Sequence, residues 1–159
     1  MGVQAMILSK EKIPVSARAE GDDVIIKYSD GSVDRRSGGT RAWRNNNPGN
    51  IRDTDFAEHR GSLGEAGGFA VFASESSGRQ AIVDLLATDA YQSLTINEAI
   101  NRYAPPIEND TKNYQMQIEK FTGFDGTVRL DSLNRQQLTG VANAIGRVEG
   151  YRVGTVTSQ

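Results

Sequence analysis

The chain has 159 residues, with 18 Lys and Arg against 20 Asp and Glu and a formal net charge of −2 at pH 7. This length fits one domain with a hydrophobic core, and the near-balance of charge gives no general attraction to nucleic acid. The absence of cysteine and the single histidine, His59, exclude disulfides, a Cys nucleophile and a multi-histidine metal centre. Side-chain chemistry is left to carboxylates, hydroxyls and amides, which suit glycoside hydrolysis without a metal or cofactor.

We expect neither a transmembrane helix nor a Sec signal peptide in this sequence. No run in the sequence approaches the roughly 18 apolar residues of a transmembrane helix. Residues 1–20 lack the apolar core and small-residue cleavage site of a Sec signal peptide. Residues 1–21 have little periodicity, so we expect an arm or a linker there.

A β-hairpin is predicted next. The segment DDVIIKYSDGSVDRR alternates about Asp30-Gly31, a pair that tolerates the positive φ of a tight turn, which places strands near 23–29 and 32–36. We expect an N-terminal arm and hairpin over residues 1–39 and a second, larger domain over 40–159.

The segment RAWRNNNPGNIR predicts a structured turn, because three asparagines followed by Pro-Gly-Asn suit neither a regular helix nor a central strand. Amides supply donor and acceptor together, and beside Trp43 they are typical of a sugar-contacting surface. Asn47 and Asn50 are therefore substrate-binding candidates. The alternative is an Asn-rich turn that caps the following strand.

Helical periodicity dominates the remainder. After a loop over 53–68 and a short strand in GGFAVFAS, apolar spacing predicts helices at about 75–88, 94–104, 110–122 and 131–149. A Thr-x-x-Glu capping box starts the second of these helices. A little β structure near the front followed by helices predicts an α+β fold, mostly helical, with a small N-terminal hairpin and a short β lobe.

Glu149 closes the last helix, whose apolar side chains recur at helical spacing, so its carboxylate leans toward the buried face. Desolvation disfavours the charged form of a carboxyl group, and this is how a glutamate becomes a general acid near neutral pH. Glu149 is therefore the candidate general acid. The alternative is a helix-terminal glutamate that reaches water before a Gly C-cap.

Three segments taken together, NNNPGNIR, GGFAVFASESSGRQAIVDLL and YAPPIENDTKNYQMQI, resemble small phage and secreted bacterial proteins that bear lysozyme-like, peptidoglycan-cleaving domains. Domains of this kind are similar to the muramidase ends of type VI secretion effectors. The resemblance covers roughly residues 40–152.

A second resemblance concerns the order of the motifs. Asn50-Ile51, Phe69 to Phe72, and Tyr103-Ala104 through Tyr114 are similar to successive pieces of autolysin-type glucosaminidases, but the catalytic helix that precedes those pieces is missing from the front of this chain. The C-terminal VANAIGRVEGYRVG resembles the Glu-Gly helix that begins phage-type lysozymes. The two resemblances together imply a circularly permuted lysozyme-like domain whose catalytic helix comes last.

The resemblance implies a cleft with Glu149 as acid, facing the 45–60 segment and close to Tyr103. No second carboxylate follows Glu149. If a second carboxylate takes part, it comes from the opposite loop, which offers Asp53, Asp55, Glu58 and Glu65. Of these we favour Glu58, mid-loop beside His59, and the alternative for each is a solvated loop acid. The polar ends of Tyr103, Glu108 and Asn109 are expected to line the cleft floor, and Tyr151 or Trp43 to stack on sugar rings. The alternatives are structural: Asn109 as a helix cap, Glu108 as a favourable charge at a helix N-terminus, and the two aromatic residues as core.

The function implied is cleavage of the β-1,4 glycan backbone of peptidoglycan by a muramidase, with a glucosaminidase or a lytic transglycosylase as alternatives. A non-catalytic peptidoglycan-binding or phage structural module is the main rival. The resemblance also implies delivery into a target periplasm by a secretion apparatus or a larger upstream polypeptide, and a cognate immunity protein as partner.

Overall fold

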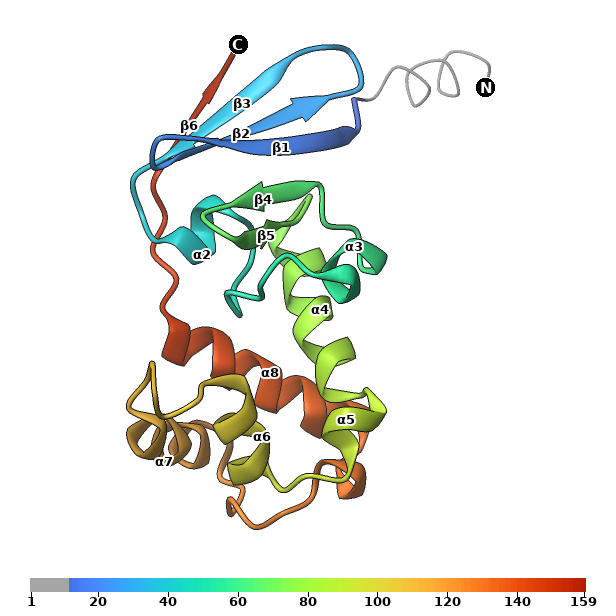
Figure 1. Ribbon diagram of the computed structural model, residues 1–159, viewed down its shortest axis with the longest axis vertical. Coiled ribbons are helices and arrows are strands. Elements are labelled where there is room, and N and C mark those ends of the chain that lie inside the picture. The colour runs from blue at the N-terminus through green and yellow to red at the C-terminus, as the bar shows by residue number, and fades with distance from the viewer. Residues whose placement is uncertain (1–11) are drawn as a thin grey trace.

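The computed structural model describes residues 12–159, and its upper lobe contains a four-stranded antiparallel sheet (Figure 1). In sheet order the strands are β1 (Pro14–Glu20), β2 (Asp23–Tyr28), β3 (Val33–Ser37) and β6 (Thr155–Ser158). The predicted hairpin is confirmed as β2 and β3, and Gly31 takes the positive φ (87°) that its turn requires.

The N-terminal segment is only partly described. The prediction of an arm or linker is wrong for Pro14–Glu20, since β1 pairs in register with β2, placing Ala17 opposite Ile26. The rest of that prediction falls largely on residues 1–11, which lie outside the described residues.

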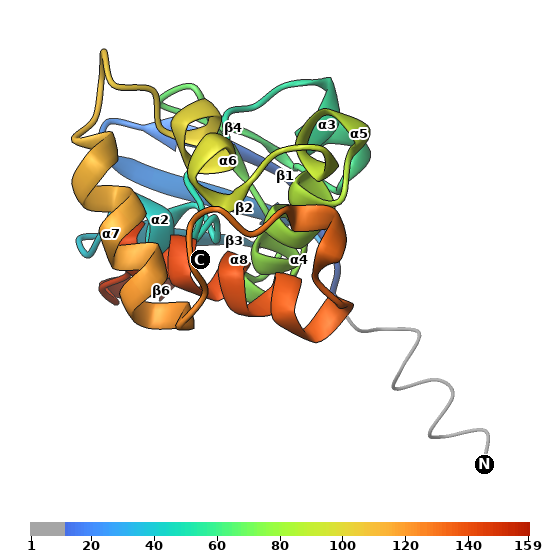
Figure 2. The same ribbon diagram turned by 90° about the horizontal axis from the view of Figure 1, so that it is seen from below.

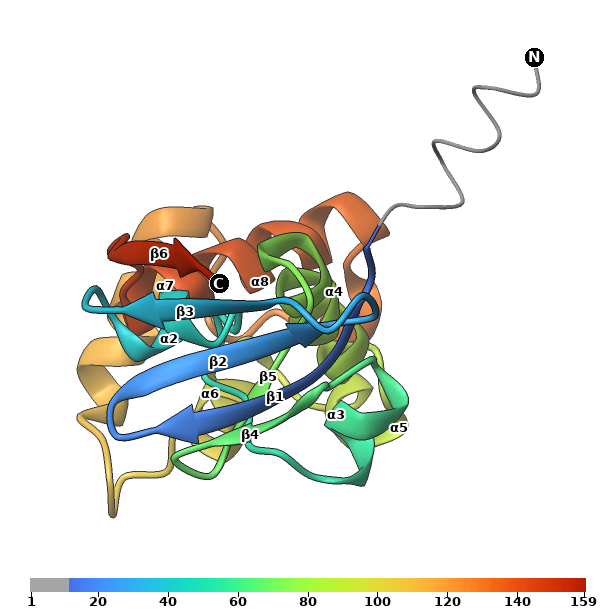
Figure 3. The ribbon, with the colours of Figure 1, turned by 90° about the horizontal axis from the view of Figure 1, so that it is seen from above.

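A second hairpin packs against the inner face of the sheet, as Figures 1 and 3 show. It consists of β4 (Gly64–Ala66) and β5 (Phe69–Val71). Val24 and Ile26 of the sheet are buried against Ala66 and Val71 of this hairpin. The predicted loop over 53–68 is therefore wrong in part, because it contains β4 and also a short helix, α3 (Asp55–His59).

The lower lobe is helical, with α8 in its middle between α4 and α7 (Figures 1 and 2). The helices that follow β5 are α4 (Glu75–Leu86), α5 (Asp89–Gln92), α6 (Ile96–Tyr103), α7 (Thr111–Thr122), the 3-10 turn η1 (Leu130–Ser132) and α8 (Arg135–Glu149). Their apolar faces close one core around side chains such as Phe72, Leu86 and Ile145, all fully buried. This is the α+β fold expected from the sequence. Within the described residues, every helix is too short or too polar to cross a bilayer.

Local signals explain most helix boundaries. The predicted capping box at the start of α6 is present: Thr95 accepts from the Glu98 amide and Glu98 accepts from the Thr95 amide. The last helix begins at Arg135, later than predicted, because Asn134 and Gln137 form a second capping box. The predicted earlier start belongs instead to η1.

The chain returns to the sheet after α8, and this return places Glu149. The Thr40 amide donates to the Arg152 carbonyl (2.9 Å), and the Arg152 amide donates to Thr40 Oγ1 (3.0 Å). The backbone beyond then pairs as β6 with β3. The N-terminal sheet therefore contains strands from both sides of the predicted domain boundary at residue 39. The return also holds the end of α8 beside the segment that begins at α2 (Arg41–Arg44).

Gly78 marks a close approach between α4 and the asparagine-rich turn. Alanine in a helix interior is ordinarily about 0.5–1 kcal/mol more stabilising than glycine, but a Cβ at Gly78 would clash with the carbonyl oxygen of Asn46 and lie 2.9 Å from Pro48 Cδ. We therefore expect Gly78→Ala to lower the free energy of unfolding by about 2 kcal/mol, measured by urea denaturation. At Gly140 in α8, a Cβ would have no heavy atom within 4 Å apart from its chain neighbours and the adjacent backbone of its own helix, so Gly140→Ala is the control and should stabilise. A Gly78→Ala protein that matched Gly140→Ala would contradict the close approach.

Candidate active site

Glu149 lies partly buried at the C-terminal end of α8, in a cleft of about 200 Å³. The cleft is lined by residues of α2, the 49–52 turn, β5, the 103–109 segment and α8: Arg41, Gly49, Asn50, Arg52, Phe69, Tyr103, Ala104, Glu108, Asn109 and Glu149. The expected placement of Glu149, facing the 45–60 segment and close to Tyr103, is confirmed.

Both oxygens of the Glu149 carboxylate are held by donors from other parts of the chain. Asn50 Nδ2 donates to Oε1 (3.0 Å), and the Tyr114 hydroxyl on α7 donates to Oε2 (2.8 Å). Burial first, and then the negative charge of Glu149, raises the pKa of Tyr114, so this phenol stays protonated and remains a donor. The orientation of the carboxyl group is therefore fixed by two elements far apart in sequence.

Tyr114 was not expected in the site, since its spacing with Ile118 and Phe121 indicates only the inner face of a helix. It is indeed 95% buried, with 5% of its surface exposed. A tyrosine on the buried face of a helix needs a hydrogen-bond partner for its hydroxyl. The sequence therefore indicates that Tyr114 has such a partner, but it does not identify the partner as Glu149.

Asn50 lines the cleft, and its conformation is unusual. Its predicted role in substrate binding stays a prediction. Its φ of 47° lies in the left-handed region, which asparagine tolerates better than most residues. Its Oδ1 accepts from Arg41 Nε (3.4 Å) while its Nδ2 donates to Glu149. This amide orientation is the one that satisfies both neighbours, because a guanidinium only donates and a carboxylate only accepts.

Asn47, by contrast, does not reach the cleft. Its side chain is fully buried, and its Nδ2 donates to the carbonyls of Ile51 (2.8 Å) and Ala70 (2.9 Å) while its Oδ1 accepts from the Ile51 amide (2.9 Å). Asn45 and Asn46 likewise donate to carbonyls of the β4–β5 hairpin and its end. The predicted substrate-binding role of Asn47 is therefore wrong. The three asparagines instead hold the β4–β5 hairpin in place through hydrogen bonds to its backbone.

The aromatic residue expected beside these amides is also structural. Trp43 is 6% exposed, and the Arg36 guanidinium lies 4.1 Å from the centroid of its ring. The ring is covered and cannot stack on a sugar.

The floor of the cleft depends on Tyr103 and Gly49. The Tyr103 hydroxyl donates to the Gly49 carbonyl, and a side chain at Gly49 would clash with that hydroxyl and with Ile82. Burial raises the pKa of Tyr103, and the charge of Glu149 raises it further, which keeps the phenol protonated. Tyr103 thus lines the cleft as predicted while it supports the turn that presents Asn50.

Glu108 and Asn109 line the cleft, as predicted, from the exposed segment before α7. Asn109 Nδ2 donates to the Pro105 carbonyl (3.2 Å). The N-cap of α7 is Asp110, which accepts from the Asn113 amide (3.2 Å). Asn109 is therefore free of the capping role, and Glu108 is the one carboxylate besides Glu149 among the residues that line this cleft.

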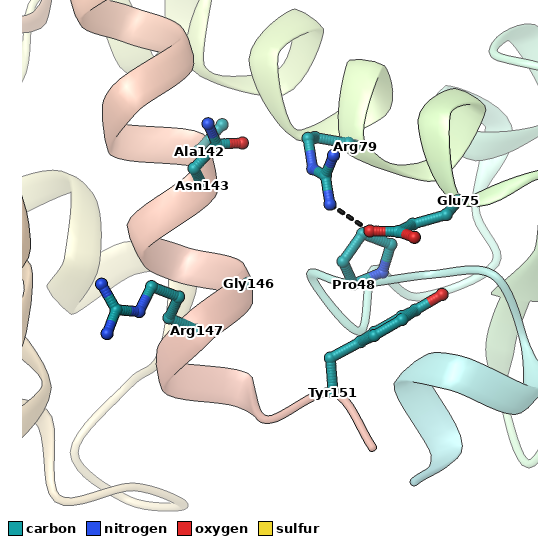
Figure 4. Close-up of a pocket in the computed structure, with 8 residues that line it drawn as sticks. All are labelled: Pro48, Glu75, Arg79, Ala142, Asn143, Gly146, Arg147 and Tyr151. Atoms are coloured by element: carbon teal, nitrogen blue, oxygen red, sulfur yellow. Dashed lines mark hydrogen bonds and ion pairs between the residues drawn. The ribbon is translucent and has the colours of Figure 1, made fainter. Parts of the chain in front are cut away.

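Two predicted site residues lie elsewhere. Glu58 is exposed on α3, in a helix where a loop was expected, and it is not part of the cleft lining. Tyr151 lines a different hollow of about 530 Å³ between α4 and α8, where its ring extends toward Pro48 and Glu75 (Figure 4). In that hollow the Glu75 carboxylate forms an ion pair with Arg79.

Among residues 12–159 no three His, Asp or Glu side chains gather where they could hold a metal ion. No family model matches the chain, and no curated protein or solved structure is significantly similar to it.

Proposed function

We propose that the chain is a lysozyme-like glycoside hydrolase that cleaves the β-1,4 glycan backbone of bacterial peptidoglycan, with Glu149 as general acid. The observation that carries the proposal is the Glu149 carboxyl group, held on both oxygens by Asn50 and Tyr114 inside a cleft. The motifs that resemble peptidoglycan-cleaving domains surround this cleft and supply the substrate class.

The proposed mechanism uses Glu149 to protonate the leaving glycosidic oxygen as an oxocarbenium-like transition state develops. In the protonated acid one oxygen carries the proton, and the other still accepts from a neighbouring donor. Tyr114 and Asn50 therefore act as positioning residues: they limit rotation of the carboxyl group so that its proton points along one direction.

The geometry of the chain supports a permuted arrangement of this domain. The resemblance covers roughly residues 40–152, and Thr40 and Arg152, at the two limits of that segment, are hydrogen-bonded to each other. A connection across this point would be short, and such closeness of ends is what makes circular permutation physically inexpensive. The strands β1 and β6, by contrast, lie at opposite edges of the sheet.

The second catalytic group is proposed to be Glu108, because it lines the cleft and Glu58 does not. A carboxylate about 5 Å from the acid would act as nucleophile, and one about 6.5–9.5 Å away would activate water. We expect Glu108→Gln to lower kcat about 100-fold or more and the control Glu58→Gln to leave it unchanged, measured as release of soluble fragments from peptidoglycan. Full activity of Glu108→Gln would point instead to attack by a hydroxyl of the substrate, with anhydro products.

The proposed function is tested by digesting purified peptidoglycan and identifying the products by mass. Reducing muramic ends indicate a muramidase, reducing glucosamine ends a glucosaminidase, and anhydro ends a lytic transglycosylase. Absence of any released glycan, with protein that is folded by circular dichroism, would contradict the hydrolase. Delivery into a target periplasm and a cognate immunity protein stay predictions from the resemblance.

A further inference from the structure

Two arginines share one aromatic ring at the cleft. The guanidinium of Arg41 lies 3.7 Å from the centroid of Phe69, and that of Arg52 lies 4.5 Å from the same centroid. Both distances are within the range of a cation–π contact. Arg41, Arg52 and Phe69 all line the cleft that contains Glu149, and both arginines are exposed.

Neither guanidinium forms an ion pair with a carboxylate of residues 12–159, although five other arginines of that range do. The hydrogen bond from Arg41 Nε to Asn50 Oδ1 uses one of its five N–H donors. The cleft therefore presents two guanidinium groups with most of their donors directed at no acceptor of the described chain.

The two positive charges also affect each other. Burial lowers the pKa of Arg41, the charge of Arg52 lowers it further, and the charge of Glu149 raises it. Like charges held this close repel, and an anion bound to both would offset the repulsion. The contact with Phe69 explains why they stay together without such an anion, because the ring restrains both side chains.

We infer that Arg41 and Arg52 form a carboxylate-binding subsite in the Glu149 cleft, so that the cleft selects a glycan whose substituents carry free carboxylates over an uncharged one. Planar guanidinium groups match carboxylates bidentately. The inference rests on the proposed function for its choice of a glycan ligand. In intact peptidoglycan the free carboxylates belong to the stem peptides, whereas removal of the stems by an amidase leaves the lactyl carboxylate of muramic acid.

The test measures binding, so that it does not depend on turnover. Glu149→Gln protein is titrated calorimetrically with three soluble β-1,4 glycans: strands with stem peptides, strands stripped by an amidase, and chitin oligosaccharides without carboxylates. The same titrations use protein that also carries Arg41→Gln and Arg52→Gln. The matched control is Arg147→Gln, since Arg147 stacks on Phe121 (4.0 Å) but lines the other hollow.

We expect loss of the two arginines to weaken binding of at least one carboxylate-bearing glycan about 100-fold, to leave chitin binding within about twofold, and to remove most of the salt dependence. Dependence on the arginines with stripped strands identifies the lactyl carboxylate, and dependence only with intact strands identifies the stem carboxylates. Equal weakening for chitin, or no weakening for either charged glycan, would overturn the subsite. If the wild-type protein binds glycan through the two arginines but cleaves none, the carboxylate subsite is supported and the proposed hydrolase activity is contradicted.

Discussion

Glu149→Gln should abolish glycan cleavage, with a fall in kcat of at least about 100-fold, while the fold and glycan binding persist. General acid catalysis typically contributes about 10²–10⁴-fold, and glutamine cannot donate the proton that the leaving oxygen needs. The substitution is nearly isosteric, and its amide oxygen can still accept from Asn50 or Tyr114. The measurement is release of soluble fragments from purified peptidoglycan over time.

The control for Glu149→Gln is Glu119→Gln, an exposed glutamate on α7, which should digest as fast as the parent. Circular dichroism and a glycan titration establish that the Glu149 variant is folded and binds. Equal digestion by Glu149→Gln and the parent would remove Glu149 from the mechanism. If parent and variant bind glycan equally and neither releases fragments, the binding module is the correct function and the hydrolase is not.

The four longest helices, α4, α6, α7 and α8, could be predicted from the sequence because their signals are local. The capping residues of α6 and α7 and the apolar stripe of α8 lie within the helices themselves or next to them. The missed elements lack such signals. The strand β6 is exposed along its length and depends on pairing with β3, a partner more than 110 residues away. The short helix α3 offers too few residues for a period to be recognised.

The position of Glu149 could be predicted because two observations in the sequence agree on it. The glutamate ends an apolar stripe, and the order of the motifs leaves the last helix as the place of the catalytic one; Glu149 does lie in the cleft. The roles of the clustered asparagines could not be predicted, because an amide can serve a ligand or the backbone equally well. The edge of β5 leaves carbonyls such as that of Ala70 in the interior, and buried carbonyls need donors. Asn45 and Asn47 meet that need, which no spacing in the sequence reveals.

Asn47 and Asn50 should therefore respond to substitution in opposite ways. Asn47→Ala removes three buried hydrogen bonds and leaves the Ile51 amide without its acceptor. At about 1 kcal/mol for each bond, and more for a buried group left unpartnered, we expect the free energy of unfolding to fall by about 3–4 kcal/mol. Urea denaturation measures this loss. The kcat of the protein that remains folded should change little, because the Asn47 side chain does not face the cleft.

Asn50→Gly is the matched variant, because glycine accepts the φ of 47° without strain and only the side chain is lost. Its free energy of unfolding should stay within about 1 kcal/mol of the parent. Its kcat should fall about 10- to 100-fold with little change in KM, since the Glu149 carboxyl group loses one of its two anchors. Full activity of Asn50→Gly would show that Asn50 does not position the Glu149 carboxyl group. Loss of activity without loss of stability in Asn47→Ala would show that the role of Asn47 is not structural. The two measurements together separate a residue that shapes the cleft from one that orients its acid.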